Sequence, residues 1–257
     1  MARLINQRRR ESIARLVRKT GFVRTSELSG RFGVSTVTIR QDIDALSADG
    51  LVQRTYGGAI SQVESSIEDT AFDLRSAANS AAKFRIGRAA AQSIRPGQTV
   101  LLDSGTTTIE IARQLPENCG ITVVTPALNI ALEAGARSGV EVLVCGGRLN
   151  PKTLSTTAHE IARSFSEIFA DRLFLATYGV DVEKGLAERS VEVAETKRAL
   201  IRAAREITLV CDSSKFGLAG PIQISPLNVV RQVITDDGIP PADLAWLRSE
   251  RIAVELV

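Results

Sequence analysis

Residues 33–50 read GVSTVTIRQDIDALSADG, and this stretch predicts the second half of a helix-turn-helix. Val34 and Ser35 form the turn, where the Ser35 side chain can accept a hydrogen bond from a free backbone N–H of the next helix. Gly50 ends that helix. The predicted apolar face consists of Val37, Ile39, Ile43 and Leu46, and the predicted polar face consists of Thr36, Thr38, Arg40 and Gln41.

The polar face offers groups that read DNA. Arginine hydrogen-bonds to guanine, and glutamine to adenine, at base edges in the major groove. A solvated face of an ordinary helix carries the same residue types, so this helix by itself favours neither interpretation. The flanking sequence decides between them.

Positive charge is concentrated near the amino terminus. Residues 1–62 contain 11 Arg or Lys against 5 Asp or Glu, whereas the remaining residues contain 21 against 24, for a net charge of +3. This asymmetry predicts nucleic-acid contact in the first quarter of the chain. A solvated basic helix around Arg8, Arg9 and Arg10 is the alternative.

The composition of the chain argues against several classes of protein and of site. The sequence has neither an apolar leader nor a run of roughly 18 to 20 apolar residues, which predicts a cytoplasmic protein without a membrane partner. Cys119, Cys145 and Cys211 are odd in number and lack CxxC spacing, and His159 is the only histidine. A disulfide framework, a metal site and a histidine-based catalytic triad are therefore not expected, and no cofactor is predicted.

The first 60 residues predict a winged helix-turn-helix. Helical patterns cover about 3–19 and 25–32, the latter capped by Thr25 or Ser26, and the reading helix follows them. Residues 51–56 then alternate like a strand before a Gly57–Gly58 turn. Arg54 and Tyr56 would lie on this wing and reach phosphates or a minor groove. Polar residues 61–72 are predicted to be a linker to a second domain, 73–257.

The second domain is predicted to be α/β, with a mostly parallel sheet covered by helices. Apolar runs alternate with helical patterns along this part of the chain. The predicted strands are 99–102, 121–124, 140–144, 173–175, 207–210 and 229–234. The predicted helices are 72–94, with Phe84, Ile86, Ala90 and Ile94 in the core, and 108–115, 127–136, 159–169 and 191–204.

Small and hydroxyl side chains follow most of these strands, where an open parallel sheet binds its ligand. Gly105 precedes three threonines at a helix start and predicts an anion cradle, because free N–H groups, hydroxyls and the helix dipole all favour negative charge. The predicted ligand-binding residues are Asp103, Ser104, Gly105, Thr106, Thr107, Thr108, Gly146, Gly147, Arg148, Asp181, Lys197 and Lys215. Tight turns use the same residue types, and Lys197 could instead form an ion pair with Glu192 or Glu195.

These residues resemble the DeoR-type bacterial transcriptional regulators over nearly the whole chain. The likeness in the first domain rests on Val34-Ser35, Thr38-Ile39-Arg40, Asp42, Leu46, Gly50, Leu51, Arg54 and Gly57-Gly58-Ala59. In the second it rests on Lys83, Asp103 to Thr107, Asn129, Gly146-Gly147, Gly179, Asp181, Gly185-Leu186, Lys197 and Asp212 to Phe216.

The resemblance implies a winged helix-turn-helix joined to a sensor domain similar to ribose-5-phosphate isomerase and CoA-transferase folds. It implies repression of a carbohydrate-use operon, relieved by a phosphorylated sugar. A single winged helix buries little surface, so a homo-oligomer, a dimer or a tetramer, is expected on double-stranded operator DNA.

Some positions depart from the family pattern. The family usually has two arginines where this chain has Arg40-Gln41, and a histidine where Tyr56 stands. The usual Gly-Ala-Asp-Gly run reads Ala176-Thr177-Tyr178-Gly179, and Ala158 replaces a usual glycine. The operator sequence is therefore not transferable, and the bulk of Tyr178 predicts a different sugar.

Two other functions remain open on the sequence. An isomerase acting on sugar phosphates could use Asp103, Asp181 and Lys215 as base and charge-stabilising groups. Against it, an isomerase needs no basic winged helix, and Cys145 stands where the isomerase pattern has a lysine. An activator with the same architecture, or an unphosphorylated ligand such as a carboxylate, is the other alternative.

Overall fold

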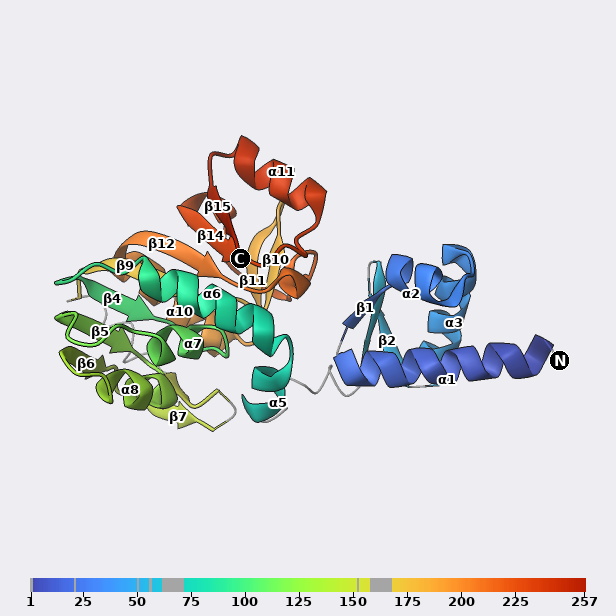
Figure 1. Cartoon of the computed structure of the whole chain (residues 1–257), viewed down its shortest axis with the longest axis horizontal. Helices are drawn as coiled ribbons and strands as arrows, with labels where there is room; N and C mark the ends of the chain where they lie inside the picture. The colour runs from blue at the N-terminus through green and yellow to red at the C-terminus, as the bar shows by residue number, and fades with distance from the viewer. Residues whose placement is uncertain are drawn as a thin grey trace. The chain divides into compact units, whose positions relative to one another are not determined.

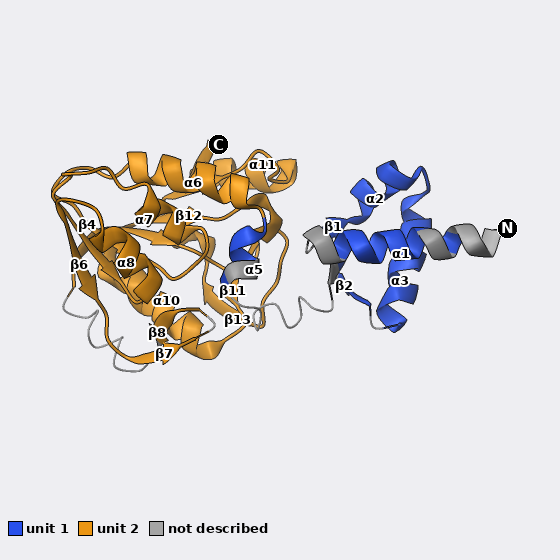
Figure 2. Cartoon of the chain, turned by 60° about the horizontal axis from the view of Figure 1, so that its bottom comes forward, with its two compact units in different colours: residues 1–78 blue, residues 79–257 orange. Residues whose placement is uncertain are grey.

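The computed structural model describes residues 2–20, 22–49, 51–55, 57–61, 72–151, 153–157 and 168–257. The chain divides into two compact units, Met1–Ala78 and Asn79–Val257 (Figure 2). Each unit has its own cluster of buried apolar side chains.

The first unit is a helix-turn-helix with a small antiparallel sheet. Its helices are α1 (Ala2–Thr20), α2 (Thr25–Phe32), α3 (Thr36–Ala48) and the short α5 (Phe72–Ala77) (Figure 1). Its strands β1 (Phe22–Arg24), β2 (Val52–Thr55) and β3 (Gly58–Ser61) pair in the order β1-β3-β2. The predicted order of three helices and a hairpin is confirmed, whereas β1 was not predicted. The core consists of Ile13, Ala14, Val17, Val23, Leu28, Ile39, Ile43, Leu46, Val52 and Ala59.

The turn between α2 and α3 follows from its residue types. Gly33 adopts a left-handed backbone conformation with φ 62°, which glycine reaches without a steric penalty. Ser35 then caps α3, because its Oγ accepts a 3.1 Å hydrogen bond from the backbone N–H of Thr38. The cap predicted for α2 is wrong: its N-cap is Arg24, and Thr25 is the buried first residue of the helix.

Val37 does not lie on the apolar face of α3. Ile39, Ile43 and Leu46 are buried, but the side chain of Val37 is 59% exposed. Residues two apart on an α-helix are rotated by about 200°, so Val37 and Ile39 point to opposite sides. The prediction that grouped them is wrong for Val37.

The second unit contains a seven-stranded parallel sheet in the order β15-β14-β12-β9-β4-β5-β6. Its strands are β4 (Thr99–Leu102), β5 (Ile121–Thr125), β6 (Val140–Val144), β9 (Ala170–Leu175), β12 (Ala204–Val210), β14 (Gln232–Thr235) and β15 (Ala253–Leu256). The predicted parallel α/β architecture is confirmed. Strand β15 and helix α11 (Pro241–Ser249) were not predicted.

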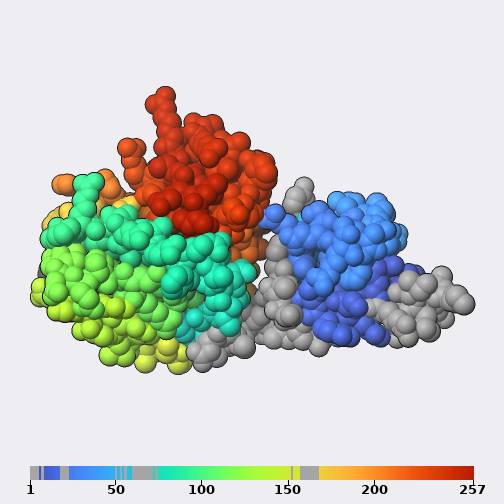
Figure 3. Space-filling view, in the orientation of Figure 1, coloured from blue at the N-terminus to red at the C-terminus, as the bar shows by residue number. Residues whose placement is uncertain are grey.

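Helices cover both faces of this sheet. Helices α6 (Ser80–Gln92), α7 (Thr108–Arg113) and α8 (Leu128–Gly135) lie side by side on one face (Figure 1). In the space-filling view the surface of this part of the chain runs from teal to green (Figure 3). Helix α10 (Val191–Ala203) packs on the other face, where Ala199 and Leu200 join a core with Leu173, Leu175 and Leu209.

Two smaller sheets flank the large one. Strands β10 (Gly179–Asp181), β11 (Gly185–Glu188) and β13 (Ile222–Ser225) form one, and β7 (Arg148–Asn150) pairs with β8 (Ser155–Thr157) in the other. Gly179 is required at its position, because a Cβ there would overlap the carbonyl oxygen of Leu218. Two 3₁₀ turns, η1 (Ser213–Lys215) and η2 (Leu227–Val229), complete the unit.

Other predictions for this part need correction. The helix predicted over 72–94 is two helices, separated at Asn79, whose φ of 52° is left-handed. Phe84, predicted in the core, is 49% exposed, whereas Ile86, Ala90 and Ile94 are buried as expected. The helix predicted over 159–169 lies outside the described residues except for 168 and 169, which are not helical.

Candidate functional site

Helix α3 presents an exposed polar surface opposite its buried face. Thr36, Arg40 and Gln41 are exposed, and Thr38 is half-buried. The hydroxyls of Ser35 and Thr38 lie 2.9 Å apart, so both are engaged at the helix start. The predicted reading residues are thus brought together, and Arg40 and Gln41 are the ones that extend into solvent.

The wing is connected to α3 by an ion pair. A guanidinium nitrogen of Arg54, on β2, lies 2.5 Å from a carboxylate oxygen of Asp44, on α3. Both side chains are about half exposed, at 53% and 49%, so the pair stabilises the fold by only ~0.2–1 kcal/mol. Tyr56, the other residue predicted on the wing, lies outside the described residues.

Part of the basic run on α1 has a structural role. Nε of Arg9 lies 2.6 Å, and Nε of Arg10 2.9 Å, from the two carboxylate oxygens of Asp42. Asp42 is 2% exposed, so a carboxylate on the inner side of α3 is neutralised by two arginines of α1. Through these two ion pairs, Arg9 and Arg10 hold α3 against α1.

Three loops meet at the carboxyl ends of the central strands β12, β9 and β4. Their core is a buried ion cluster: Nζ of Lys197 lies 2.6 Å from Asp103 Oδ2 and 3.2 Å from Glu188 Oε1. Lys197 also donates to the carbonyl oxygen of Ala176 at 2.8 Å. All three donors of the ammonium group are therefore used, and the predicted site residues Asp103 and Lys197 bind each other.

The cluster fixes the loops that follow β4 and β9. Asp103 accepts hydrogen bonds from the backbone N–H of Ser104 at 2.7 Å and of Ala176 at 3.1 Å. Burial raises the pKa of Asp103, and Glu188 adds to this, although Lys197 opposes it. Burial would lower the pKa of Lys197, but the two carboxylates outweigh burial and raise it. Lys197 therefore remains an ammonium shared by two acids.

The threonine loop begins α7. Ser104, Gly105 and Thr106 are half-buried, and Thr107 and Thr108 are buried. Thr108 Oγ1 donates a hydrogen bond to the carbonyl oxygen of Gly105 at 3.1 Å, so the proton of this hydroxyl is already used within the loop. Thr106 is the threonine whose position leaves its side chain most open at the strand ends.

Lys215 lies beside an aromatic ring at the same edge of the sheet. Its Nζ is 6.0 Å from the centroid of the Tyr178 ring, and the Arg189 guanidinium carbon is 5.6 Å from that centroid. Tyr178 follows β9, Lys215 follows β12, and these strands are neighbours. Tyr178 and Arg189 were not among the predicted site residues, although the bulk of Tyr178 had singled it out.

The Lys215 turn is held by Asp212. The Asp212 carboxylate accepts hydrogen bonds from Asn79 Nδ2 at 2.8 Å, from the backbone N–H of Ser214 at 3.2 Å, and from the Ser214 hydroxyl. Burial alone raises the pKa of Asp212, but Lys215, these hydrogen bonds and Lys83 outweigh it, so the pKa lies below its usual range.

The remaining predicted ligand-binding residues are bonded within their own turns or exposed on the surface. Asp181 accepts hydrogen bonds from the backbone N–H of Glu183 and of Lys184, each at 3.0 Å, and so stabilises the β10–β11 turn. Gly146, Gly147 and Arg148 are exposed and follow β6, the edge strand. Arg148 forms a 3.2 Å ion pair with Glu192 in which both side chains are largely exposed.

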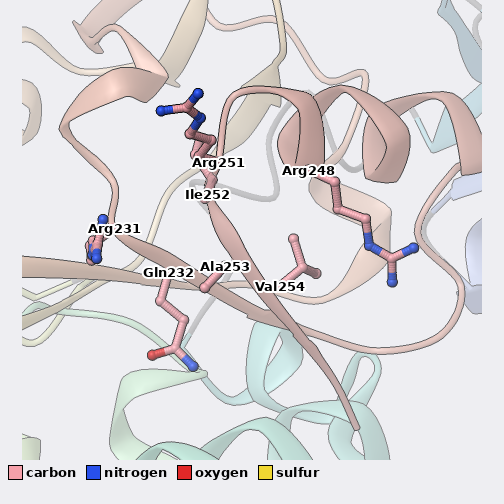
Figure 4. Close-up of a pocket in the computed structure, with 7 residues that line it drawn as sticks. All are labelled: Arg231, Gln232, Arg248, Arg251, Ile252, Ala253 and Val254. Carbon is pink, nitrogen blue, oxygen red and sulfur yellow. The ribbon is translucent and has the colours of Figure 1, made fainter.

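A groove of about 560 Å³ lies elsewhere, at the amino ends of β14 and β15 (Figure 4). None of the predicted site residues lines it. The guanidinium groups of Arg248 and Arg251 point away from each other and do not converge on one position. Its lining consists of Arg231, Gln232, Arg248, Arg251, Ile252, Ala253 and Val254.

The described part of the chain contains neither a candidate metal site nor a candidate membrane span. The cysteine and carboxylate side chains of the described residues form no group of three that could hold a metal ion, and His159 lies outside these residues. None of the described helices has the length and apolar character needed to cross a bilayer.

Family models match both units of the chain. Residues 78–237 match the DeoR C-terminal sensor domain, and residues 9–65 match the DeoR-like helix-turn-helix domain. A candidate aga operon transcriptional repressor of Escherichia coli O157:H7 is 36% identical over 97% of this chain and 93% of its own length. The glycerol-3-phosphate regulon repressor of Escherichia coli K12 is 32% identical over 96% of this chain and 98% of its own length.

Among solved structures, ribose 5-phosphate isomerase A of Methanocaldococcus jannaschii aligns with 52% of this chain and 53% of its own, at 13% identity and a TM-score of 0.38. The family assignment rests on the sequence matches. The two models together span most of the chain, and the relatives match it over almost its full length. The chain belongs to the DeoR family of transcriptional regulators.

Proposed function

We propose that this protein is a sequence-specific transcriptional repressor of a carbohydrate-use operon and that a phosphorylated sugar releases it from its operator. The observation that carries the proposal is the exposed Arg40–Gln41 face of α3, directed away from the core of a helix-turn-helix. The relatives named as repressors of the aga operon and the glycerol-3-phosphate regulon support repression over activation, and carbohydrate use as the type of pathway. A regulator of transcription acts on the chromosome, which supports the predicted cytoplasmic location.

The operator contacts divide into two kinds. Arg40 and Gln41 read base edges from the major groove, with Thr36 beside them. Arg54 and Tyr56 contact phosphates or a minor groove from the wing, and Ser35 and Thr38 orient the helix start. Because one winged helix buries little surface, we propose that a dimer or tetramer binds repeated half-sites.

The effector binds at the carboxyl ends of β4, β9 and β12. Lys215 supplies a positive charge there, and Thr106 and the backbone of residues 105–107 supply hydrogen-bond donors. The ring of Tyr178 packs against the sugar. Asp103 and Lys197 hold these loops in place through the buried ion cluster. Gly146, Gly147, Arg148 and Asp181 remain predicted effector contacts; of these, Arg148 pairs with Glu192, and Asp181 accepts hydrogen bonds from the backbone of its own turn.

Fluorescence anisotropy on DNA from upstream of the protein's own and neighbouring genes tests the proposal. We expect tight, salt-sensitive binding, because phosphate contacts release counterions. One sugar phosphate of a panel should release the DNA, whereas its free sugar should not. Binding that no sugar phosphate alters would contradict the effector assignment, and activation or carboxylate ligands would then be tested.

Two matched variants separate the DNA and effector roles. Arg40→Ala should lose operator recognition while its circular dichroism spectrum and melting temperature stay unchanged, because Arg40 is exposed. Lys215→Ala should keep operator binding but need a higher effector concentration for release. Arg248→Ala removes an exposed cation from the opposite end of the strands and serves as the control.

We propose that this site binds the sugar phosphate and does not convert it into a product. The relatives are named as regulators, and Asp103, one of the acids that an isomerase could use as a base, is bonded to Lys197 and not free. Detectable isomerisation of ribose 5-phosphate or a related ester by the purified protein would contradict this.

A further inference from the structure

Val37 stands out on the surface of α3. It is a large aliphatic residue, 59% exposed, in the first turn of the helix. The buried residues of α3 are Ile39, Asp42, Ile43 and Leu46. At about 100° per residue, the direction opposite the centre of that buried face is the direction in which Val37 points. Val37 therefore projects as directly away from the core as any side chain of this helix can.

The neighbours of Val37 on this surface are polar. Arg40 and Gln41 lie three and four residues further along, which places them on the same side of the helix. Asp44 follows at seven residues and is held by Arg54 on the wing. Val37 is thus the apolar member of a stripe that otherwise offers hydrogen-bonding groups.

The fold gives no reason for a valine at this position. Val37 packs in no apolar cluster of the described residues. A β-branched side chain on an exposed helix also loses rotamer freedom that alanine does not. The contacts of the free protein therefore give this side chain no packing role.

From this geometry we propose that Val37 reads the operator by packing against the C5-methyl group of a thymine in the major groove, next to the base that Gln41 contacts. The inference rests on the proposed function as an operator-binding repressor. In the major groove the thymine methyl is the apolar feature that distinguishes the base pairs, and residues at the start of a recognition helix are the ones that reach base edges. Val37 is then a specificity-determining residue for this protein.

Uracil in place of thymine tests the contact, because it removes the methyl group and leaves Watson–Crick pairing intact. With an operator fragment that the wild-type protein binds, each thymine is replaced in turn by deoxyuridine and the dissociation constant is measured by anisotropy. We expect one position per half-site at which uracil weakens wild-type binding about three- to tenfold, the effect of losing a few buried methyl contacts. Val37→Ala should weaken binding to the thymine operator by a similar factor and should bind thymine and uracil equally at that position.

Leu51→Ala is the matched control, since Leu51 is also an exposed aliphatic residue of this unit, at 44%, but lies outside α3. It should retain the wild-type sensitivity to uracil. Wild-type binding that is sensitive to base changes but indifferent to every uracil would overturn the inference and leave the proposed function standing. So would a Val37→Ala protein with the wild-type preference for thymine. Absence of sequence-specific binding by the wild-type protein would instead overturn the proposed function, and the inference with it.

Discussion

Asp42 is the residue that fixes α3 against α1. Its carboxylate is buried and receives Arg9 and Arg10 from the other helix, so it sets the orientation from which Arg40 and Gln41 extend. A buried carboxylate between two cations is costly to break, because removing the acid leaves two positive charges close together with one of them largely out of water.

We therefore expect Asp42→Ala to lower the free energy of unfolding by roughly 1–3 kcal/mol. Asp44→Ala on the same helix breaks the exposed pair with Arg54 and should cost no more than ~1 kcal/mol. Urea unfolding followed by circular dichroism compares the two variants. Equal stabilities would show that the Asp42 cluster contributes no more than a surface pair.

The sequence predicted some of these residues and not others, for physical reasons. Ser35 was identifiable as a cap because capping depends on local chain geometry alone. Val37 was misplaced because a spacing of two was counted as one face of a helix. The arginine partners of Asp42 lie 32 and 33 residues away in sequence, and Asp103 lies 94 residues from Lys197, so no local pattern could reveal these pairs.

The turn η1 after β12 carries Lys215 and depends on Asp212. Asp212 lies at the end of a buried strand, and its carboxylate closes the turn through Asn79 and Ser214. The turn is short and has no apolar pattern of its own. Its stability therefore depends on side-chain carboxylates: that of Asp212, and that of Asp236, which accepts hydrogen bonds from the backbone N–H and the hydroxyl of Ser213.

The lowered pKa of Asp212 predicts a dependence on pH. Relative to the unfolded chain, with a pKa near 3.8, the ionised form is favoured in the folded state. Its contribution to stability is present above the unfolded pKa and disappears as pH falls through the lower folded pKa. Asp212→Asn should thus be less stable than wild type at pH 7, by roughly 1–3 kcal/mol, and the difference should shrink below about pH 4. Thermal unfolding across pH 3–7 measures it, and a pH-independent difference would contradict the assignment.

Gly179 sets the distance between β10 and the segment that contains Leu218. We expect Gly179→Ala to destabilise the second unit by roughly 1–3 kcal/mol, because the new methyl meets backbone that has no room to move. Gly146→Ala is the control in the same unit, since open space surrounds that position. The melting temperatures of the two variants test this expectation. A Gly179→Ala protein as stable as Gly146→Ala would contradict the close approach of residue 179 to the carbonyl oxygen of Leu218.

Elements were predictable where burial imposed a pattern. Strands β4 and β5 were predicted almost to the residue, because each is a largely buried apolar run between turns. The edge strand β6 was predicted although none of its residues is buried, because four of its five residues are valine or leucine. Strand β15 was missed since it has only four residues, of which three, Ala253, Glu255 and Leu256, are exposed at the sheet edge. The β10–β11–β13 sheet was missed because three- and four-residue strands carry too little periodicity.

For the molecule as a whole, the proposed function couples two binding events in different units. The family models assign DNA binding to one unit and sensing to the other. Coupling of this kind is reciprocal: if the effector weakens operator binding by some factor, the operator must weaken effector binding by the same factor.

We expect saturating operator DNA to raise the effector dissociation constant by about 5- to 150-fold, the usual range for such coupling. Isothermal titration of the effector into free protein and into the protein–operator complex measures the factor. A scrambled DNA duplex of the same length is the control. Equal effector affinities with and without operator would contradict release by coupling, even if the effector binds tightly.

The ion pair between Arg54 and Asp44 also bears on how the protein searches the chromosome. In the free protein, Asp44 cancels the charge of the wing arginine. On random sequence, where the reading helix gains few contacts, a phosphate must compete with this carboxylate for Arg54, so encounters should be brief. On the operator, the proposed contacts of α3 would hold the phosphate in place long enough for the exchange. We therefore expect the carboxylate to shorten the time spent on wrong sites, by a small factor because the pair is half exposed.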